Sequence, residues 1–344
     1  MRVTIRQVAR EAGVSVATVS RVLNASGPVS AETSRRIRDV AARLRYAPNE
    51  AARALTRSRT HTIGVLLPDI YGEFFSEVIR GIDQRTRREG YHLLVSGSHD
   101  DPAEMEAALS AMRGRVDGLL LMFPDAAAQA SLGDLAHDVP FVLINGAARQ
   151  ERASVVAMDN AGGARAVVRH LLALGHTRIA TITGAPGNSD AAERLRGYRE
   201  ALRAARVERP AELEVAGDFT EDGGHLAMRR LLELSDRPTA VFAANDSMAI
   251  GALGAVREAG LVVPDDVAVV GFDDIPIARY VTPPLSSIRV AIDELGRLAA
   301  ERLFEALEAG EDHRPTRDVL PAQLIVRGSC GATLPRAGPA HAPP

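Results

Sequence analysis

The sequence predicts a small all-α head followed by a larger α/β body with two lobes. The chain has 344 residues, 46% of them hydrophobic, which is too long for one ordinary core and favours a small domain plus a bilobed one. Charge divides the chain in the same way. Residues 1–60 hold twelve arginines against four acidic residues, a net charge of +8, whereas the remainder holds 29 against 40, a net charge of −11. A basic head on an acidic body is typical of a protein that binds a polyanion with one end.

The first helix of the head is predicted from its end signals. Thr4 and Gln7 have the spacing of a capping box, so a helix is expected from there to about Ala12. Gly13 ends this helix, because glycine readily adopts the left-handed conformation that a sharp turn between helices requires.

A second helix is expected over residues 16–24, capped by Ser15. Val19 and Val22 supply the apolar face that packs on Val8, which is the arrangement of a helix-turn-helix with its second helix presented to the DNA major groove. A helical hairpin with a purely structural role is the alternative. The residue spacing, the N-terminal position and the surrounding basic block favour DNA binding.

A third helix completes a compact head over residues 1–46. Ser30 caps it, and its apolar residues recur at helical spacing, so they are expected in the core. These residues are Ile37, Val40, Ala41 and Leu44.

From residue 62 onward, short apolar runs of strand length alternate with amphipathic helical segments. The expected strands are 63–67, 93–95, 118–122, 141–144, 179–182, 240–243 and 267–272. The expected helices include 75–89, 103–113, 162–174, 193–205, 246–259 and 292–307. Two such βαβ series predict two lobes with parallel sheets, and ligands of such folds bind at the carboxyl ends of the strands.

Composition argues against several other classes of protein. The single cysteine, Cys330, cannot form an intramolecular disulfide, and the nine histidines lack the spacings of metal-binding motifs, so we expect neither a metal nor another cofactor. The sequence has no apolar run of the roughly 18–20 residues that a membrane span needs. Residues 1–7 lack the apolar stretch of a secretory signal, so a cytoplasmic protein is expected.

In its motifs the chain resembles the lactose and galactose repressor family of transcription regulators. The resemblance extends over residues 4–329 and is carried in the head by Val8-Ala9, Ala12-Gly13-Val14-Ser15, Thr18-Val19-Ser20-Arg21-Val22-Leu23-Asn24, Tyr46-Ala47-Pro48-Asn49 and Ala52-Arg53-Ala54-Leu55. It implies a regulator, in most cases a repressor, that binds double-stranded operator DNA and responds to a small effector. Because one recognition helix reads only a few base pairs, we expect a homodimer on a pseudo-palindromic site, with the first lobe at the interface.

By this resemblance, Val16 and Ala17 open the recognition helix and face base edges, with Arg21 behind them. Their chemistry agrees. Val16 and Ala17 suit apolar features such as a thymine methyl group, whereas Arg21 can donate two hydrogen bonds to guanine. The short polar residues suited to phosphate contacts are Thr4, Ser15, Thr18, Ser20 and Asn24, with capping as a competing role for the first two.

A hinge is expected over residues 47–61. Pro48 favours a short helix behind it, from Asn49 to Leu55, and seven residues make a marginal helix in water. The resemblance implies that this helix, including Asn49 and Ala52, folds on the operator and that Leu55 wedges into the minor groove. Packing of Leu55 on its own body is the alternative.

The body resembles the type I periplasmic-binding-protein fold that the same family carries, and it is expected over residues 62–329. The resemblance implies three crossings between the lobes, with 62–159 and 291–319 in the first lobe and 163–286 and 322–329 in the second. The tail over residues 330–344 is rich in alanine and proline and is expected to be disordered. It has no heptads, so a tetramer is not expected.

Candidate effector-binding residues come from the expected strand ends and helix starts. Asp69 follows the first strand and Phe74 begins a helix, and by resemblance the others that line the site are Arg194, Phe219, Asn245 and Asp273. Carboxylate, amide and guanidinium groups beside aromatic faces suit a sugar. We expect Arg194 and Asp273 to bind effector hydroxyls directly, without core partners, so that Asp273→Asn leaves the melting temperature nearly unchanged.

Structural roles are the alternatives for three neighbouring residues: core packing for Phe75, N-capping for Asp246, and a surface or hinge position for Asp274. An enzyme is a rival function, with Asp273-Asp274 as an acid/base pair or residues 183–189 as a phosphate loop. Adjacent side chains on a strand point to opposite faces, however, and a P-loop needs a lysine that this sequence lacks. A transport receptor is disfavoured by the head. A regulator that responds to a non-sugar metabolite or to a protein partner remains the alternative.

Overall fold

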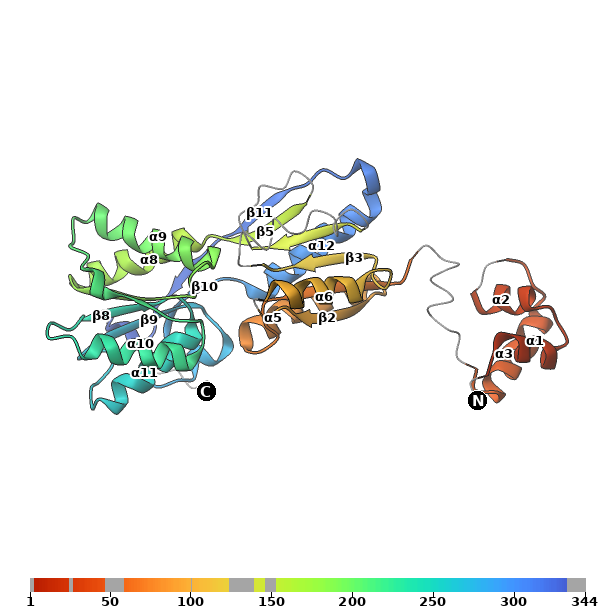
Figure 1. Ribbon diagram of the computed structural model, residues 1–344, viewed down its shortest axis with the longest axis horizontal. Helices are drawn as coiled ribbons and strands as arrows, with labels where there is room; N and C mark the ends of the chain where they lie inside the picture. Colours follow the sequence, from red (N-terminus) through yellow and green to blue (C-terminus); the bar gives the residue numbers. More distant parts are fainter. Residues whose placement is uncertain are drawn as a thin grey trace, which may run out of the picture. The chain divides into compact units, whose positions relative to one another are not determined.

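The computed structural model describes residues 3–24, 27–46, 59–99, 101–123, 139–145 and 153–332. The chain divides into two compact units, residues 1–60 and 61–344 (Figure 1). The structure contains the helices and strands that the sequence pattern predicts, and in addition helix α10 (Glu221–Leu232) and several short strands.

The head contains the three expected helices: α1 (Ile5–Ala12), α2 (Val16–Asn24) and α3 (Ala31–Arg43). The Thr4 backbone N–H donates to Gln7 Oε1 at 2.8 Å, and Gly13 has a φ of 63°, as the turn requires. Ser15 Oγ accepts from the Thr18 N–H at 3.1 Å, and Ser30 caps α3 in the same way. The core of the head is made by buried residues of all three helices, including Val8, Val19 and Ile37.

The first lobe of the body is built on a six-stranded sheet with the order β11-β5-β4-β3-β1-β2. Its strands are β1 (Thr62–Leu67), β2 (His92–Gly97), β3 (Gly118–Leu121), β4 (Phe141–Ile144), β5 (Ser154–Met158) and β11 (Arg317–Leu320), and all of their pairings are parallel. Its helices are α5 (Glu73–Arg88), α6 (Pro102–Met112) and α12 (Ile292–Ala309). Helix α12 lies against α5 and covers one face of the sheet.

The second lobe is built on a sheet with the order β12-β10-β9-β8-β6-β7. Its strands are β6 (Ile179–Thr183), β7 (Glu214–Ala216), β8 (Ala240–Ala243), β9 (Ala268–Asp273), β10 (Ser286–Arg289) and β12 (Gln323–Ile325). Its helices are α8 (Asn160–Ala173), α9 (Ser189–Ala204), α10 (Glu221–Leu232) and α11 (Asp246–Glu258), with short 3₁₀ turns at Ala211–Leu213, Pro276–Arg279 and Gly328–Cys330; a further 3₁₀ turn, Gly310–Asp312, follows α12 in the first lobe. The pairing of β10 with β12 is antiparallel, whereas the sequence pattern suggested parallel sheets throughout.

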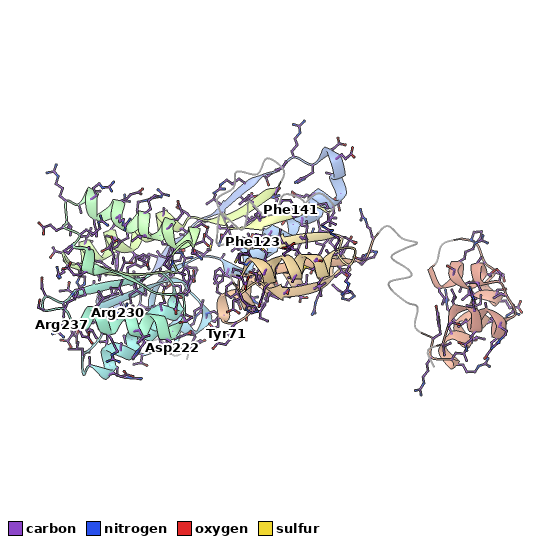
Figure 2. The ribbon with its side chains drawn as sticks, viewed as in Figure 1. Tyr71, Phe123, Phe141, Asp222, Arg230 and Arg237 are labelled. Atoms are coloured by element: carbon purple, nitrogen blue, oxygen red, sulfur yellow. The ribbon has the colours of Figure 1, made fainter. Side chains whose placement is uncertain are left out.

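The strands of the first sheet come from residues 62–158 and 317–320, and those of the second from residues 179–289 and 323–325, so the chain passes between the sheets three times. Phe123 and Phe141 lie within the first lobe, whereas the charged Arg230 and Arg237 lie on the outside of the second (Figure 2). Strand residues of both sheets, such as Val65 and Val269, are fully buried.

Cys330, at the expected start of the tail, is fully buried in the core of the second lobe. The rest of the tail from residue 333 and most of the expected hinge, residues 47–58, lie outside the described residues. Among the described residues, no helix is long and apolar enough to cross a membrane.

Candidate functional site

The head exposes one face of helix α2. Val16, Ala17 and Arg21 lie on this face and are exposed, with 41% of the Val16 surface accessible, although valine is usually buried. The opposite face, with Val19 and Val22, packs in the core. The structure therefore brings the three predicted base-reading residues together on an outward surface.

The short polar residues of the head have local partners. Ser15 caps α2, and its Oγ lies 2.8 Å from Thr18 Oγ1, so its capping role is realised. Thr4 is exposed at the start of α1, and Ser20 is half-buried. The side chain of Asn24 lies outside the described residues, as do Asn49, Ala52 and Leu55. Phosphate contacts of these residues stay a prediction.

The main cavity of the body, about 210 Å³, lies between the lobes at the carboxyl ends of the strands. Three helices of the second lobe begin at its wall, because each follows a strand that ends there. Their caps are polar residues of the wall: Asn188 Oδ1 accepts from the Ala191 N–H, Thr220 Oγ1 from the Gly223 N–H, and Asn245 Oδ1 from the Met248 N–H.

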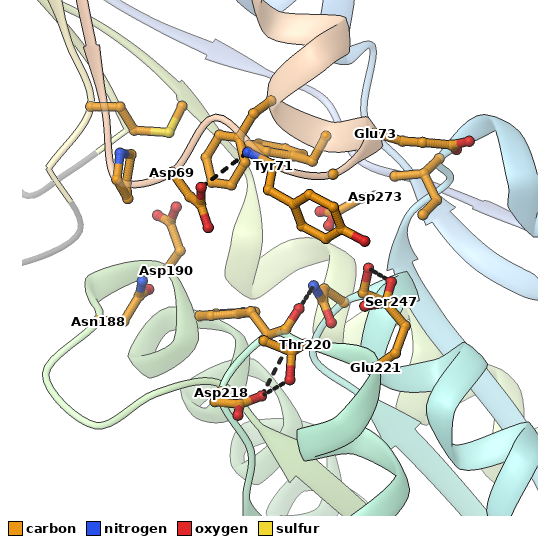
Figure 3. Close-up of a pocket in the computed structure, with 18 of the residues that line it drawn as sticks. Asp69, Tyr71, Glu73, Asn188, Asp190, Asp218, Thr220, Glu221, Ser247 and Asp273 are labelled. Carbon is orange, nitrogen blue, oxygen red and sulfur yellow. Dashed lines mark hydrogen bonds between the residues drawn. The ribbon is translucent and has the colours of Figure 1, made fainter. Parts of the chain in front are cut away.

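All six residues that the sequence singled out lie in this wall: Asp69, Phe74, Arg194, Phe219, Asn245 and Asp273. Figure 3 shows Asp69 and Tyr71 of the first lobe facing Asp190, Asp218 and Asp273 of the second across the cavity. Further wall residues that were not predicted as site residues carry polar or aromatic side chains: Tyr71, Glu73, Asn145, Asn188, Asp190, Asp218, Thr220, Glu221 and Ser247.

The expectation that Arg194 and Asp273 have no core partner is wrong. Arg194 Nη2 lies 3.2 Å from Asp273 Oδ1, and both side chains are buried, with 4% and 6% exposed. Arg194 Nε also donates to Asn160 Oδ1 at 2.8 Å, Nη1 donates to the Ala244 carbonyl, and the guanidinium lies 3.9 Å from the centre of the Phe272 ring. The pair therefore forms part of the lobe's interior as well as the cavity wall.

Burial dominates the electrostatics of this pair. It raises the pKa of the Asp273 carboxyl to about 7; the Arg194 charge opposes this rise and the Asp190 charge adds to it. Burial also raises the pKa of Asp190, against the opposing effects of Arg194 and of the amide donors of Asn145 and Asn160. The Arg194 guanidinium thus stabilises the charged forms of two carboxylates, Asp190 and Asp273, in a region of low dielectric constant.

Two buried oxygen atoms of the wall lack a hydrogen-bond donor in the part of the chain that the structure describes: Asn145 Oδ1 and Asp273 Oδ1. The 3.2 Å approach of Arg194 to the latter is an ion pair without hydrogen-bonding alignment. Asn145 and Asp273 also have positive φ angles, 57° and 105°, as does Phe219 with 70°. Unpaired buried acceptors and strained backbone are typical of a site that awaits a ligand.

The structural roles considered for Asp246 and Asp274 are not the ones that the structure shows. Asp246 does not cap α11, because the cap is Asn245; Asp246 is the fully buried first residue of the helix and accepts from Ser287 Oγ at 2.6 Å and from the Ile275 N–H. A surface position for Asp274 is wrong. Its carboxylate is 1% exposed and pairs with Arg289 and Arg327, which flank two of the crossings between lobes.

Phe75 packs on the core and also lines the cavity, so both of its suggested roles are realised. Asn245 lies in the wall, but its Nδ2 donates to the Phe219 carbonyl at 2.9 Å, so it also positions Phe219. The Phe219 ring in turn fits against Gly184, where an added Cβ would lie 2.1 Å from the ring.

Comparisons with known proteins agree with both units. The family of bacterial regulatory proteins described as the lacI family matches residues 4–49, and the periplasmic binding protein-like domain matches residues 168–330. The ribose operon repressor of Escherichia coli (strain K12) is 38% identical over 94% of this chain and 96% of its own length. The HTH-type transcriptional repressor PurR of Edwardsiella ictaluri is 35% identical over 95% and 96%.

Two solved structures are also similar. A lac repressor dimer bound to operator and the anti-inducer ONPF has a TM-score of 0.86 and 30% identity, and the match covers 96% of this chain and 100% of that one. A complex of the transcriptional regulator CelR with cellobiose has a TM-score of 0.73 and 35% identity over 95% and 100%. The similarity to both spans the head and the body.

Proposed function

Because the chain belongs to the lacI family of bacterial regulatory proteins, we propose that it represses transcription from a pseudo-palindromic operator under the control of a sugar. The chain is a DNA-binding transcription regulator with an effector-binding body. The sugar binds between the lobes and changes the affinity of the head for DNA. The observation that carries the sugar assignment is the cavity wall, which offers unpaired oxygen acceptors beside the aromatic rings of Phe74 and Phe219.

A sugar satisfies this wall better than an apolar ligand does. Its hydroxyl groups supply the donors that Asn145 Oδ1 and Asp273 Oδ1 lack, and its C–H faces pack on aromatic rings. The cavity, at about 210 Å³, is smaller than the roughly 300–1,000 Å³ of sites for drug-sized ligands, which favours a monosaccharide. The CelR complex holds cellobiose, so a related regulator does bind a sugar.

The head reads the operator through α2. Val16 and Ala17 contact apolar base features and Arg21 contacts guanine, while the excess of exposed arginines attracts the phosphates. Two heads related by two-fold symmetry read matched half-sites, so we propose a homodimer, which sedimentation under DNA-binding conditions tests; a monomer would contradict it. The protein acts in the cytoplasm, where its operator is accessible.

We assign no catalytic step to the cavity. Asp273 faces the cavity, whereas Asp274 pairs with Arg289 and Arg327 inside the second lobe, so the two carboxylates do not work on one substrate. A regulator of the same fold that responds to a non-sugar metabolite or to a protein partner is the second candidate, because the similar repressor PurR is not named for a sugar.

A panel of sugars tests the proposal through two measurements on the full chain. Thermal unfolding identifies a ligand as the sugar that raises the melting temperature in a concentration-dependent way. Fluorescence anisotropy with operator DNA then measures how that sugar changes DNA affinity; reciprocal linkage requires an equal change of sugar affinity on DNA. Stabilisation by nucleobases and by no sugar would overturn the sugar assignment in favour of the second candidate.

A further inference from the structure

The cavity wall has an uneven charge. Among the wall residues that the structure describes, six carry carboxylates and one carries a cationic side chain, Arg194. The acidic residues are Asp69, Glu73, Asp190, Asp218, Glu221 and Asp273. Both lobes contribute, so a ligand between them meets carboxylates from two sides (Figure 3).

Arg194 is not free to bind an anion. Its Nε and Nη1 donate to Asn160 and to the Ala244 carbonyl, its Nη2 pairs with Asp273, and its face lies on the Phe272 ring. A phosphate group entering the cavity would have to displace these protein partners. It would then leave Asp273 buried without a counter-charge, which is strongly unfavourable.

Four helices begin at residues of the cavity wall, α5 of the first lobe and α9, α10 and α11 of the second, and the positive pole of each favours negative charge. Gly72 caps α5 without a side-chain hydrogen bond. However, Glu73 in the first turn places a carboxylate at the same pole, and Asp69 lies just before it. These charges offset the helix dipole.

The Asp190 carboxylate is held by amide donors from both sides of the cavity wall. Its Oδ2 accepts from Asn145 Nδ2 of the first lobe at 2.9 Å, and its Oδ1 accepts from Asn160 Nδ2 at 3.0 Å. Each oxygen has one amide donor and can accept another hydrogen bond. Asn145 is a buried residue, 2% exposed, and its Oδ1 has no hydrogen-bond donor among the described residues. Because it lies beside the Asp190 carboxylate, this part of the wall has more hydrogen-bond acceptors than donors.

We propose that Asp190 makes the cavity selective for uncharged polyhydroxyl ligands: ligand hydroxyls donate to Asp190, Asn145 and Asp273, while the Asp190 charge excludes phosphorylated forms of the same sugars. This inference rests on the proposed function and adds the charge class of the effector. It separates this chain from a sensor of sugar phosphates, whose site needs spare guanidinium or ammonium groups.

Isothermal titration of the full-length protein tests the proposal with matched pairs of probes: ribose and ribose 5-phosphate, and glucose and glucose 6-phosphate. We expect a neutral sugar to bind about 100-fold or more tightly than its phosphate, because a charged group meets like charges in a partly desolvated site. In Asp190→Asn, which keeps the size and one acceptor, this ratio should fall by about 10-fold. Melting temperatures report whether each variant folds.

Two further variants separate charge from hydrogen bonding. Asn145→Ala removes a neutral acceptor together with the amide that donates to Asp190, but it leaves the Asp190 carboxylate in place, so it should weaken binding of the neutral sugar by about 10-fold without lowering the ratio. Glu200→Gln is the matched control, because Glu200 lies on the same helix and pairs with Arg165 and Arg196 outside the cavity wall. It should change neither quantity.

The outcomes distinguish the two proposals. A phosphate that binds as tightly as its parent sugar would overturn charge selection and leave the sugar-controlled regulator intact. If the ratio of sugar affinity to sugar-phosphate affinity is unchanged in Asp190→Asn, Asp190 is not the residue that selects against the phosphate. If neither the sugar nor its phosphate binds, both in these pairs and in a wider set of pentoses and hexoses, the sugar assignment is overturned and this inference with it.

Discussion

Replacing Asp273 by asparagine removes a buried carboxyl group whose pKa lies near neutrality. In the folded chain, burial raises this pKa from 3.8 to about 7. The folded state therefore holds the proton more tightly than the unfolded state does. The stabilisation from this proton is fully present below about pH 4 and is lost as the pH rises through about 7. Asp273→Asn lacks this proton equilibrium, so its stability relative to the original chain should increase with pH.

The size of the effect follows from the shift. About three pKa units at about 1.4 kcal/mol per unit correspond to about 4 kcal/mol, of which about 3 kcal/mol should be measured above about pH 5, because the loss begins near the unfolded pKa of 3.8. The assay is urea unfolding of the body followed by far-UV circular dichroism between about pH 5 and 8, since the chain has no tryptophan for fluorescence. Carboxylates remote from Asp273 titrate in both proteins and cancel in the difference, whereas Asp190 contributes to it because its charge acts on Asp273. A difference that stays constant within ~0.5 kcal/mol would show that Asp273 is ionised throughout and would refute the reasoning.

Three other substitutions test the head and the cavity. Arg21→Ala should cost roughly 1–3 kcal/mol of operator affinity and relax base preference at one symmetric position, as anisotropy with operator variants would measure. Leu55→Ala should instead reduce the bending of operator DNA, measured by energy transfer between labelled DNA ends; equal losses on operator and random DNA in both variants would contradict these roles. Gly184→Ala should weaken effector binding by about 10-fold, because the new Cβ would lie 2.1 Å from the Phe219 ring and push it into the cavity. Unchanged affinity would place Phe219 away from the ligand.

The parts of the fold that the sequence predicts well are those with strong local signals. The three head helices begin and end at capping residues, and the central strands of both sheets are continuous apolar runs. Most of the strands that were not predicted from the sequence lack such an apolar run. Strands β7, β11 and β12 have three or four residues each and carry polar side chains at sheet edges, where only tertiary pairing makes them strands.

The site was predictable to the extent that ligands bind at strand ends. That rule and the family resemblance place Asp69 and Asp273 correctly in the wall, and the same rule applied to strand β4 would have found Asn145. Asp190 has no such signal, because its place in the wall depends on the loop after β6 and on the Asn188 cap of α9. The pairing of Arg194 with Asp273 was not predictable, since the two residues are far apart in the sequence and meet only in the folded lobe.

Two residues of the cavity wall carry energetic costs that a bound ligand can offset. A buried acceptor without a donor costs about 1–3 kcal/mol, and left-handed backbone at non-glycine residues adds strain of similar order. Asn145 in the first lobe and Asp273 in the second both combine these features. A ligand whose hydroxyls satisfy both acceptors therefore gains binding free energy from the two lobes at once. Because the gain requires both lobes in contact with the same molecule, occupancy of the cavity favours particular lobe arrangements over others, and this differential affinity is what allows an effector to control DNA binding.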